Sequence, residues 1–299
     1  MARFGHIESY EYNEPDLFDS VKSDTGSMVV KITENQLRCL ESCGSGSYGM
    51  VKKELLNGKA VAVKYFHSRI CLLDEIQNLI SLSHPNIIKF IGIGPEESLV
   101  MEYSEIGSLH QILHVQIDVH YSLDHAIGWC LQAASALAYL HSLKPRPMMH
   151  RDLKPANLLL FDGGRTVKLC DFGTLRRVGG QVSYGLGTVA YMAPEVFQTT
   201  DYTEKCDVYS WTVLLWEVIT RQEPYKGMES AQIMFSVCNG KRLPLPDGAD
   251  PVLLKLMSLA WHDNPTVRPS MRKVESILQD LFKIDYDTEI LSYSNSQSL

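Results

Sequence analysis

The first regular pattern of apolar and polar positions begins near Leu40 and predicts a set of β-strands. The stretch VAVKYF alternates apolar and polar residues and is rich in β-branched and aromatic side chains. The Asn57-Gly58 pair that precedes it is a typical two-residue hairpin turn. The segments NIIKFIGIG and SLVMEY continue the strand pattern up to Tyr103. We therefore expect a β-rich first lobe.

One helical stripe interrupts these strands. Between residues 69 and 82 the apolar side chains stand at positions 72, 73, 76, 79 and 80, which is helical spacing. Glu75 lies beside this stripe, and a carboxylate that points partly inward needs a partner. Lys64, on the strand before the helix, is the obvious one.

After Tyr103 the pattern becomes mainly helical. A long apolar stripe covers residues 124–143, and a short hairpin that turns at Asp162-Gly163-Gly164 comes later. We place the boundary between the two lobes at residues 102–107. The polar residues 1–35 predict a flexible N-terminal arm, and residues 284–299 predict a polar C-terminal tail. The whole pattern predicts an α+β protein with two unlike lobes.

Composition narrows the classes of function. The chain has 299 residues, of which 45% are hydrophobic and 21% charged, and its net charge is −7. A negative chain gives no reason to expect nucleic-acid binding, and no apolar run is long enough for a membrane span. The N-terminus is too polar for a signal peptide. Seven cysteines without a CxxC pair suggest a reducing compartment, so we expect a cytoplasmic protein.

The candidate chemistry centres on the sequence HRDLKPAN, residues 150–157. Phosphoryl transfer needs a group that orients the attacking hydroxyl and charges that face the phosphoryl group. Asp152 is suited to the first task, Lys154 to the second, and Asn157 to binding a metal ion. Asp171 follows Asn157 by one hairpin and can approach the same ions. The alternative, a surface loop with an Asp and an Asn, suits a bare His-Arg-Asp but not all eight residues.

A glycine-rich run, GSGSYGMV at residues 44–51, precedes Lys64. Such a loop can lie over phosphates, but alone it is a weak signal because it also opens dinucleotide-binding folds. Those folds continue into a helix, whereas strands follow here. Lys64 is then a candidate ligand of the α- and β-phosphates of a nucleotide.

Taken together, these motifs resemble the protein kinase family from about Gln36 to about Lys283, and they occur in the family's order. The matched pieces are GSGSYGMV, VAVK, Glu75, HRDLKPAN, DFG, APE, DVYSW and Arg268. The resemblance implies a bilobal kinase fold in residues 36–283. Its β-rich N-lobe would span residues 36–103 and carry one regulatory helix, with a hinge at 102–107 and a mainly helical C-lobe at 108–283.

The family's roles transfer to matching positions. The resemblance implies ATP as co-substrate, with Mg²⁺ held by Asn157 and Asp171. It also implies a catalytic set and a nucleotide-binding set. The catalytic residues would be Asp152, Lys154, Lys64 and Glu75; the ATP-binding residues would be Cys43, Gly44, Gly46, Gly49, Val51, Ala62, Lys64, Met101, Glu102, Ser104 and Leu159. Further residues would be structural: Asp207 below the catalytic loop, the pair Glu195–Arg268, and a spine of Leu79, Phe90, His150 and Phe172.

The class of kinase follows from longer stretches. Lys154 after HRD, and Thr188 in GTVAYMAPE, are typical of serine/threonine kinases. HPNIIKFIGIG, KLCDFGT and EKCDVYSW are similar to the TGF-β-activated group of MAP kinase kinase kinases. This similarity implies MAP kinase kinases as substrates in JNK/p38-type stress and innate immune signalling. It also implies regulatory phosphorylation at Ser183 and Thr188, and leaves room for an activating partner on the C-lobe. The rival interpretation is a pseudokinase-like scaffold that binds MAP kinase kinases without efficient turnover.

Two features depart from the family pattern. Cys43 stands where the family prefers an aliphatic residue over the adenine. The connector between Lys64 and Glu75 is shorter than usual, so that Asp74 is a second candidate partner for Lys64. Glu75 fits the spacing to His84-Pro85-Asn86 better. A short connector is expected to hold the helix inward, although it can equally be a neutral surface deletion.

Overall fold

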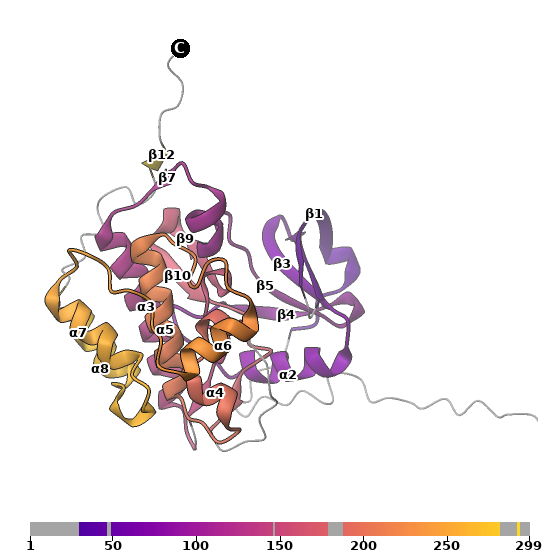
Figure 1. Ribbon diagram of the computed structural model, residues 1–299. Coiled ribbons are helices and arrows are strands. Elements are labelled where there is room, and N and C mark those ends of the chain that lie inside the picture. The colour runs from indigo at the N-terminus through magenta and orange to yellow at the C-terminus, as the bar shows by residue number, and fades with distance from the viewer. Residues whose placement is uncertain (1–29, 47–48, 146, 179–187, 282–291, 294–299) are drawn as a thin grey trace, which may run out of the picture.

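The computed structural model shows two lobes of different composition, with strands in one and mostly helices in the other (Figure 1). It describes residues 30–46, 49–145, 147–178, 188–281 and 292–293. The first lobe contains β1 (Leu37–Gly46), β2 (Gly49–Leu56), β3 (Lys59–Phe66), α2 (Arg69–Leu79), β4 (Phe90–Gly94) and β5 (Ser98–Glu102). The predicted α+β architecture of two unlike lobes, one β-rich with a single helix and one mainly helical, is confirmed.

The first lobe is built on one five-stranded antiparallel sheet with the order β1-β2-β3-β5-β4. The predicted hairpin turn lies between β2 and β3, with Asn57 at φ 50° and Gly58 at φ 82°. Two successive positive φ angles are what a type I′ turn requires, and Asn-Gly adopts them readily. This register places Lys64 opposite Val51 on β2 and Leu99 on β5, in the middle of the sheet.

Residues 30–32, near the end of the predicted arm, lie against the edge strand β4. The N–H of Ile32 donates to the carbonyl of Ile93 at 2.8 Å, and the N–H of Ile93 donates to the carbonyl of Val30 at 3.0 Å. A Cβ on Gly92 would lie 2.5 Å from the Val30 carbonyl oxygen, so glycine permits this approach. Ile32 is buried. The chain thus joins the sheet before residue 35, because an apolar side chain can be buried there; residues 1–29 lie outside the described part.

The second lobe packs its helices around α3 and α5, which run side by side through its centre (Figure 1). Both helices are largely buried, and α5 carries the fully buried Trp211. The helices are α3 (Leu123–Ser142), α4 (Pro194–Gln198), α5 (Lys205–Thr220), α6 (Ser230–Cys238), α7 (Pro251–Ala260) and α8 (Met271–Leu281). The strands are β6 (Gly107–Ser108), β7 (Val119–His120), β8 (Met148–Met149), β9 (Leu158–Phe161), β10 (Thr166–Leu169), β11 (Arg176–Arg177) and β12 (Ser292–Tyr293).

The elements that hold the predicted chemistry lie close to their expected bounds. The helix expected at 69–82 ends at Leu79, and the helix expected at 124–143 is α3. The β9–β10 hairpin turns at Asp162-Gly163-Gly164 as predicted, with φ angles of 52°, 66° and 91°. In the part of the chain that the structure describes, no helix combines the length and apolar character needed to cross a bilayer.

Candidate active site

Lys64 joins three elements at the junction of the two lobes. Its Nζ donates to Glu75 Oε2 on α2 at 2.7 Å and to Asp171 Oδ1 at 3.1 Å. Lys64 and Glu75 are buried. The partner is Glu75, the residue that the spacing favoured over Asp74. The sequence therefore predicted this ion pair correctly, and the structure adds Asp171 as a second partner.

Lys64 and Asp171 each favour the charged form of the other, whereas burial and the nearby Asp171 carboxylate raise the pKa of Glu75 despite the Lys64 ammonium. Burial alone would lower the pKa of the Lys64 ammonium, but the carboxylates of Glu75 and Asp171 outweigh that effect and raise it. Burial acts to raise the pKa of Asp171, but the Lys64 ammonium has the larger effect, so the pKa of Asp171 is lowered. Lys64 and Asp171 are thus held in their charged forms, as ligands of phosphate and of a metal ion must be.

A very short connector carries the chain from Lys64 to Glu75. Strand β3 ends at Phe66 and α2 begins at Arg69, so only two residues lie between them. Ser68 at the helix N-cap still has extended backbone angles, φ −142° and ψ 133°. Because an extended residue spans at most roughly 3.6 Å, this link keeps the start of α2 close to the end of β3.

The catalytic loop gathers polar groups around Asp152. The amide nitrogen of Asn157 donates to the Asp152 carbonyl at 2.8 Å and to its Oδ2 at 3.0 Å. Lys154 Nζ lies 2.8 Å from the same Oδ2. The other carboxylate oxygen, Oδ1, accepts from the N–H of Thr188 at 3.0 Å and from its hydroxyl at 3.2 Å. Asp152 is therefore buried but well hydrogen-bonded, and its orientation is fixed.

Asp207 on α5 holds this loop from below, as the sequence suggested. Its carboxylate accepts from the backbone N–H groups of His150 and Arg151, each at 2.8 Å, and lies 2.9 Å from His141 Nε2. Burial acts to raise the pKa of Asp207, but the hydrogen bonds from His141 and Arg151 outweigh it and lower it. The ionised carboxylate stabilises the turn at Arg151, whose φ of 70° is unusual for a side-chain-bearing residue.

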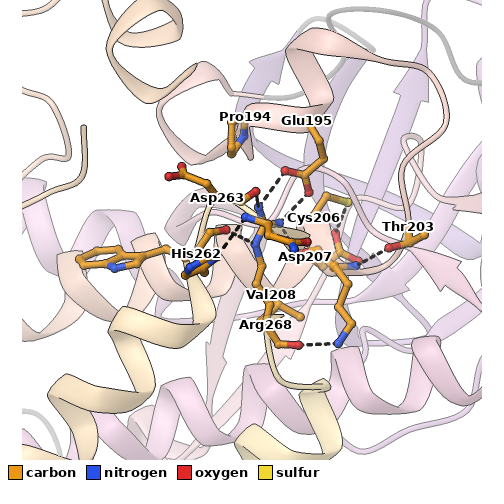
Figure 2. Close-up of polar contacts among 12 residues, drawn as sticks. Pro194, Glu195, Thr203, Cys206, Asp207, Val208, His262, Asp263 and Arg268 are labelled. Carbon is orange, nitrogen blue, oxygen red and sulfur yellow. Dashed lines mark hydrogen bonds and ion pairs between the residues drawn. The ribbon is translucent and has the colours of Figure 1, made fainter. Parts of the chain in front are cut away.

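A second, largely buried ion pair lies just after the activation segment, residues 174–192. Figure 2 shows the Arg268 guanidinium pointing at the Glu195 carboxylate. The two Arg268–Glu195 bonds measure 2.6 and 2.8 Å, which makes the pair bidentate. Arg268 also donates to the Lys205 carbonyl at 2.9 Å, and Lys205 Nζ donates back to the Arg268 carbonyl at 2.6 Å. Helices α4 and α5 are thereby tied to the loop before α8.

The residues predicted to bind the nucleotide lie mainly on β1, β2, β3 and β5 and on the segment after β5. Gly44 and Gly46 on β1 pair with Val51 and Gly49 on β2. A Cβ at Gly49, whose φ is 157°, would lie 1.9 Å from the Tyr65 carbonyl oxygen. A side chain at position 49 would collide with the backbone of β3, so only glycine fits there. The tip residues 47–48 lie outside the described part.

The other predicted nucleotide contacts line the same junction. Ala62 pairs with Met101 across β3 and β5, and Leu159 pairs with Lys168 in the β9–β10 hairpin. The Glu102 side chain is engaged with Lys168 at 2.7 Å, and the Ser104 hydroxyl donates to the Leu160 carbonyl at 2.5 Å. The side chains of Glu102 and Ser104 thus hold the hinge segment against the β9–β10 hairpin.

Cys43, expected over the adenine, is exposed.

Asn157 and Asp171 offer a donor set that suits Mg²⁺. The side-chain nitrogen of Asn157 donates to Asp152. The side-chain oxygen of Asn157 is therefore the atom left to bind a cation. Asp171 adds a carboxylate, and both are hard oxygen donors of the kind that Mg²⁺ prefers. His150 and Phe172 of the predicted spine meet edge to face beside these residues, with ring centroids 5.4 Å apart.

With this geometry described, comparison with known proteins identifies the fold. The pattern of the family "Protein tyrosine and serine/threonine kinase" matches residues 37–278. The chain belongs to the protein kinase family. This kinase is 42% identical over 264 residues to mitogen-activated protein kinase kinase kinase 7 of Drosophila melanogaster, covering 86% of the chain and 38% of the relative. It is 41% identical over 261 residues to the human protein of the same name, covering 85% and 43%.

A third relative is covered more completely. A mitogen-activated protein kinase kinase kinase 7-like protein of Drosophila melanogaster is 37% identical over 281 residues, with 88% of this chain and 69% of the relative covered. The chain spans about two fifths of the length of the first two relatives. These relatives support a serine/threonine kinase of the MAP kinase kinase kinase 7 type.

The kinase site contains contacts that the sequence did not predict. The hydroxyl of Thr188, a predicted phosphorylation site, donates to Asp152 Oδ1 at 3.2 Å and accepts from Lys154 Nζ at 2.8 Å. A phosphate here would set about −1.5 to −2 charges against the Asp152 carboxylate. This geometry favours a positioning role for the hydroxyl. Ser183, the other predicted phosphorylation site, lies outside the described residues.

A buried polar cluster beside the site was also not predicted from the sequence. Glu217 on α5 accepts from the Tyr191 hydroxyl at 2.6 Å and lies 2.7 Å from His114 Nε2. Burial raises the pKa of Glu217 to about 7 and lowers that of His114. The only sequence signal was a Glu within the apolar run of α5, which would need a partner.

Proposed function

We propose that this kinase transfers the γ-phosphoryl group of ATP to serine or threonine hydroxyls of protein substrates. The observation that carries this proposal is the arrangement of Lys64, Glu75 and Asp171 in one ion cluster, with Asp152 held by Asn157. Full activity in this family needs both the Lys–Glu pair and the metal-binding Asp in place. Turnover needs this arrangement, whereas a scaffold could bind MAP kinase kinases without it.

Each residue of the catalytic loop has a task in the proposed reaction. Asp152 orients the substrate hydroxyl and accepts its proton as the phosphoryl group moves to the oxygen. Lys154 contacts the transferred phosphoryl group, and Lys64 holds the α- and β-phosphates. Asn157 and Asp171 would hold Mg²⁺, which offsets the charge of the phosphate oxygens when bound. The Thr188 N–H and hydroxyl keep Asp152 in position.

The substrates are proposed to be MAP kinase kinases, within JNK/p38-type stress and innate immune signalling in the cytoplasm. Support comes from the similarity to relatives named mitogen-activated protein kinase kinase kinase 7. An activating protein partner is proposed on the C-lobe. Helix α6 exposes Met234 and Phe235, by 42% and 71%, and offers an apolar surface for it.

Activation is proposed to include autophosphorylation at Ser183. Arg151 donates from Nε to the Thr174 carbonyl at 2.6 Å, while its buried Nη2 has no hydrogen-bond partner among the described residues. A guanidinium with a spare donor is suited to a phosphate on the activation segment. Ser183→Ala is then expected to lower activity, and phosphate should be found at Ser183 in the wild type.

The substrate class is tested by incubating the purified chain with Mg²⁺, ATP and catalytically inactive MAP kinase kinases, followed by mass spectrometry. We expect phosphate on activation-segment serines or threonines of the substrate, and none with the Lys64→Met variant. Phosphorylation of a generic protein but of no MAP kinase kinase would overturn the substrate class. No phosphorylation of any protein, with the chain folded and ATP bound, would favour the scaffold instead.

A further inference from the structure

The C-terminal tail returns to the C-lobe and adds a strand to it. Strand β12 pairs antiparallel with β7, with Ser292 opposite His120 and Tyr293 opposite Val119. Figure 1 shows the two strands together at the edge of the C-lobe, away from α7 and α8. This pairing joins the end of the chain to a segment more than 170 residues earlier in the sequence.

The backbone of β7 determines which residue of the tail is bound. The N–H of Val119 donates to the Gln116 carbonyl at 3.0 Å, and its carbonyl accepts from Arg221 Nη1 at 2.7 Å. In an antiparallel pair, opposite residues alternate between hydrogen-bonded and non-hydrogen-bonded positions. Because the Val119 N–H already donates to Gln116, the alternation favours His120 and Ser292 as the hydrogen-bonded pair.

Arg221 connects β7 to the turn that precedes it. This residue caps α5 at φ 54°, and its guanidinium donates to three further carbonyls: those of Ile112, Leu113 and Gln116, at 2.7, 3.0 and 3.1 Å. The π-helical turn Gln111–Val115 and β7 are therefore held as one unit around a single side chain.

The same unit is linked to the turn that follows Thr188, beside the proposed catalytic base. His114, within the turn, lies 2.7 Å from Glu217, and Glu217 accepts from Tyr191 at 2.6 Å. Tyr191 ends the 3-10 turn Val189–Tyr191, which directly follows Thr188. Thr188 in turn donates to Asp152. An unbroken chain of hydrogen bonds and short backbone segments thus leads from β7 to the proposed catalytic base.

We propose that the tail segment around Ser292–Tyr293 is an intramolecular ligand of β7, and that this added strand stabilises the surface that receives the protein substrate. Adding an extended segment to a strand edge is a common mode of peptide recognition, in which main-chain hydrogen bonds supply the affinity. The tail sequence suits this mode because Tyr293, an aromatic residue that favours strands, follows Ser292.

The test is Ser292→Pro in the full chain, because proline removes the N–H that pairs with His120. Ser296→Pro, four residues further along, makes the same change beyond the paired residues. Hydrogen exchange of residues 111–121 should become roughly two- to tenfold faster in Ser292→Pro, the value of about one backbone hydrogen bond, and stay unchanged in Ser296→Pro. Equal exchange in wild type and Ser292→Pro would overturn the docking.

Two further readouts separate the parts of the proposal. The effect on substrate rests on the proposed kinase function: Ser292→Pro should raise KM for a protein substrate by a similar factor and leave KM for ATP unchanged. Faster exchange with an unchanged protein KM would overturn the link to the substrate side. Protection of residues 111–121 that depends on protein concentration would show a tail from a second copy and overturn the intramolecular assignment. Faster exchange in a chain that phosphorylates nothing would refute only the proposed function.

Discussion

The backbone N–H of Thr188 donates a hydrogen bond of 3.0 Å to Oδ1 of Asp152, and the Thr188 hydroxyl reaches the same oxygen at 3.2 Å. The activation segment therefore contributes directly to the orientation of the proposed catalytic base. Lys154 completes the group, since its Nζ contacts both the Thr188 hydroxyl and Oδ2 of Asp152 at 2.8 Å.

Removing this hydroxyl should slow the chemical step. Thr188→Ala keeps the backbone bond to Asp152 but loses the two hydroxyl contacts. One hydrogen bond to a charged group corresponds to about 1.5–3 kcal/mol, so we expect kcat to fall by roughly ten- to a hundredfold. Thr188→Ser, the matched control, retains the hydroxyl and should stay within a few-fold of wild type. If Thr188→Ala and Thr188→Ser have equal kcat values, the hydroxyl does not position Asp152.

The short connector between β3 and α2 makes a second prediction. Inserting three glycines after His67 lengthens the two-residue link to five residues. Loop entropy then favours outward positions of α2 by about 0.8 kcal/mol, on the order of a fourfold loss of basal activity. The same insertion after Gly248, whose surroundings are open, is the control. Unchanged basal activity in the His67 insertion would mean that the connector does not restrain the Lys64–Glu75 pair.

The buried Glu217 predicts a dependence of stability on pH. Burial raises its pKa from 4.5 to about 7, so between these values the folded state binds more protons than the unfolded state. The contribution of Glu217 to the free energy of unfolding is complete below pH 4.5, declines as pH rises, and is lost above about pH 7. A shift of this size corresponds to about 3 kcal/mol.

His114 requires a control in this measurement, because burial lowers its pKa and gives the opposite sign. The free energy of unfolding is therefore compared between His114→Gln and His114→Gln/Glu217→Gln from pH 4.5 to 7.5. The difference should fall by up to about 3 kcal/mol across that range. A difference that stays constant with pH would show that Glu217 titrates normally.

Cys170 gives a prediction about reactivity. Its thiol stands directly before Asp171, and burial raises its pKa. Because the thiolate is the reactive form, an electrophile built on an ATP-site ligand should label Cys170 slowly at neutral pH and faster as pH rises. ATP should slow this labelling, and Cys170→Ser should abolish it. A labelling rate that ATP does not change would place the thiol outside the nucleotide pocket.

How far the sequence predicted this site depends on whether the residues belong to a compact motif. Asp152, Asn157, Asp171 and Lys64 lie in segments whose local pattern carries their chemistry, and the structure pairs Lys64 with Asp171 and Asn157 with Asp152. The pair Glu195–Arg268 was found in the same way.

The contacts that were missed join residues without a local signature. His114 and Glu217 are single polar residues on different elements, and only the packing of the π-helical turn against α5 brings them together. Arg221 donates to four carbonyls of residues 112–119, a contact that nothing in the sequence around Arg221 indicates. The strand formed by Ser292 was hidden because a two-residue strand in a polar tail has no periodicity to detect.

The most direct test of the account is the turnover of Asp152→Asn, measured as phosphate transferred to a protein substrate under saturating ATP and Mg²⁺. The amide oxygen can still accept from Thr188, but the side chain can no longer take up the proton of the substrate hydroxyl. We predict a fall in kcat of roughly 10²–10⁴-fold in a chain that stays folded, with unchanged ATP affinity. Turnover close to that of the wild type would contradict the account, because phosphoryl transfer would then not depend on Asp152.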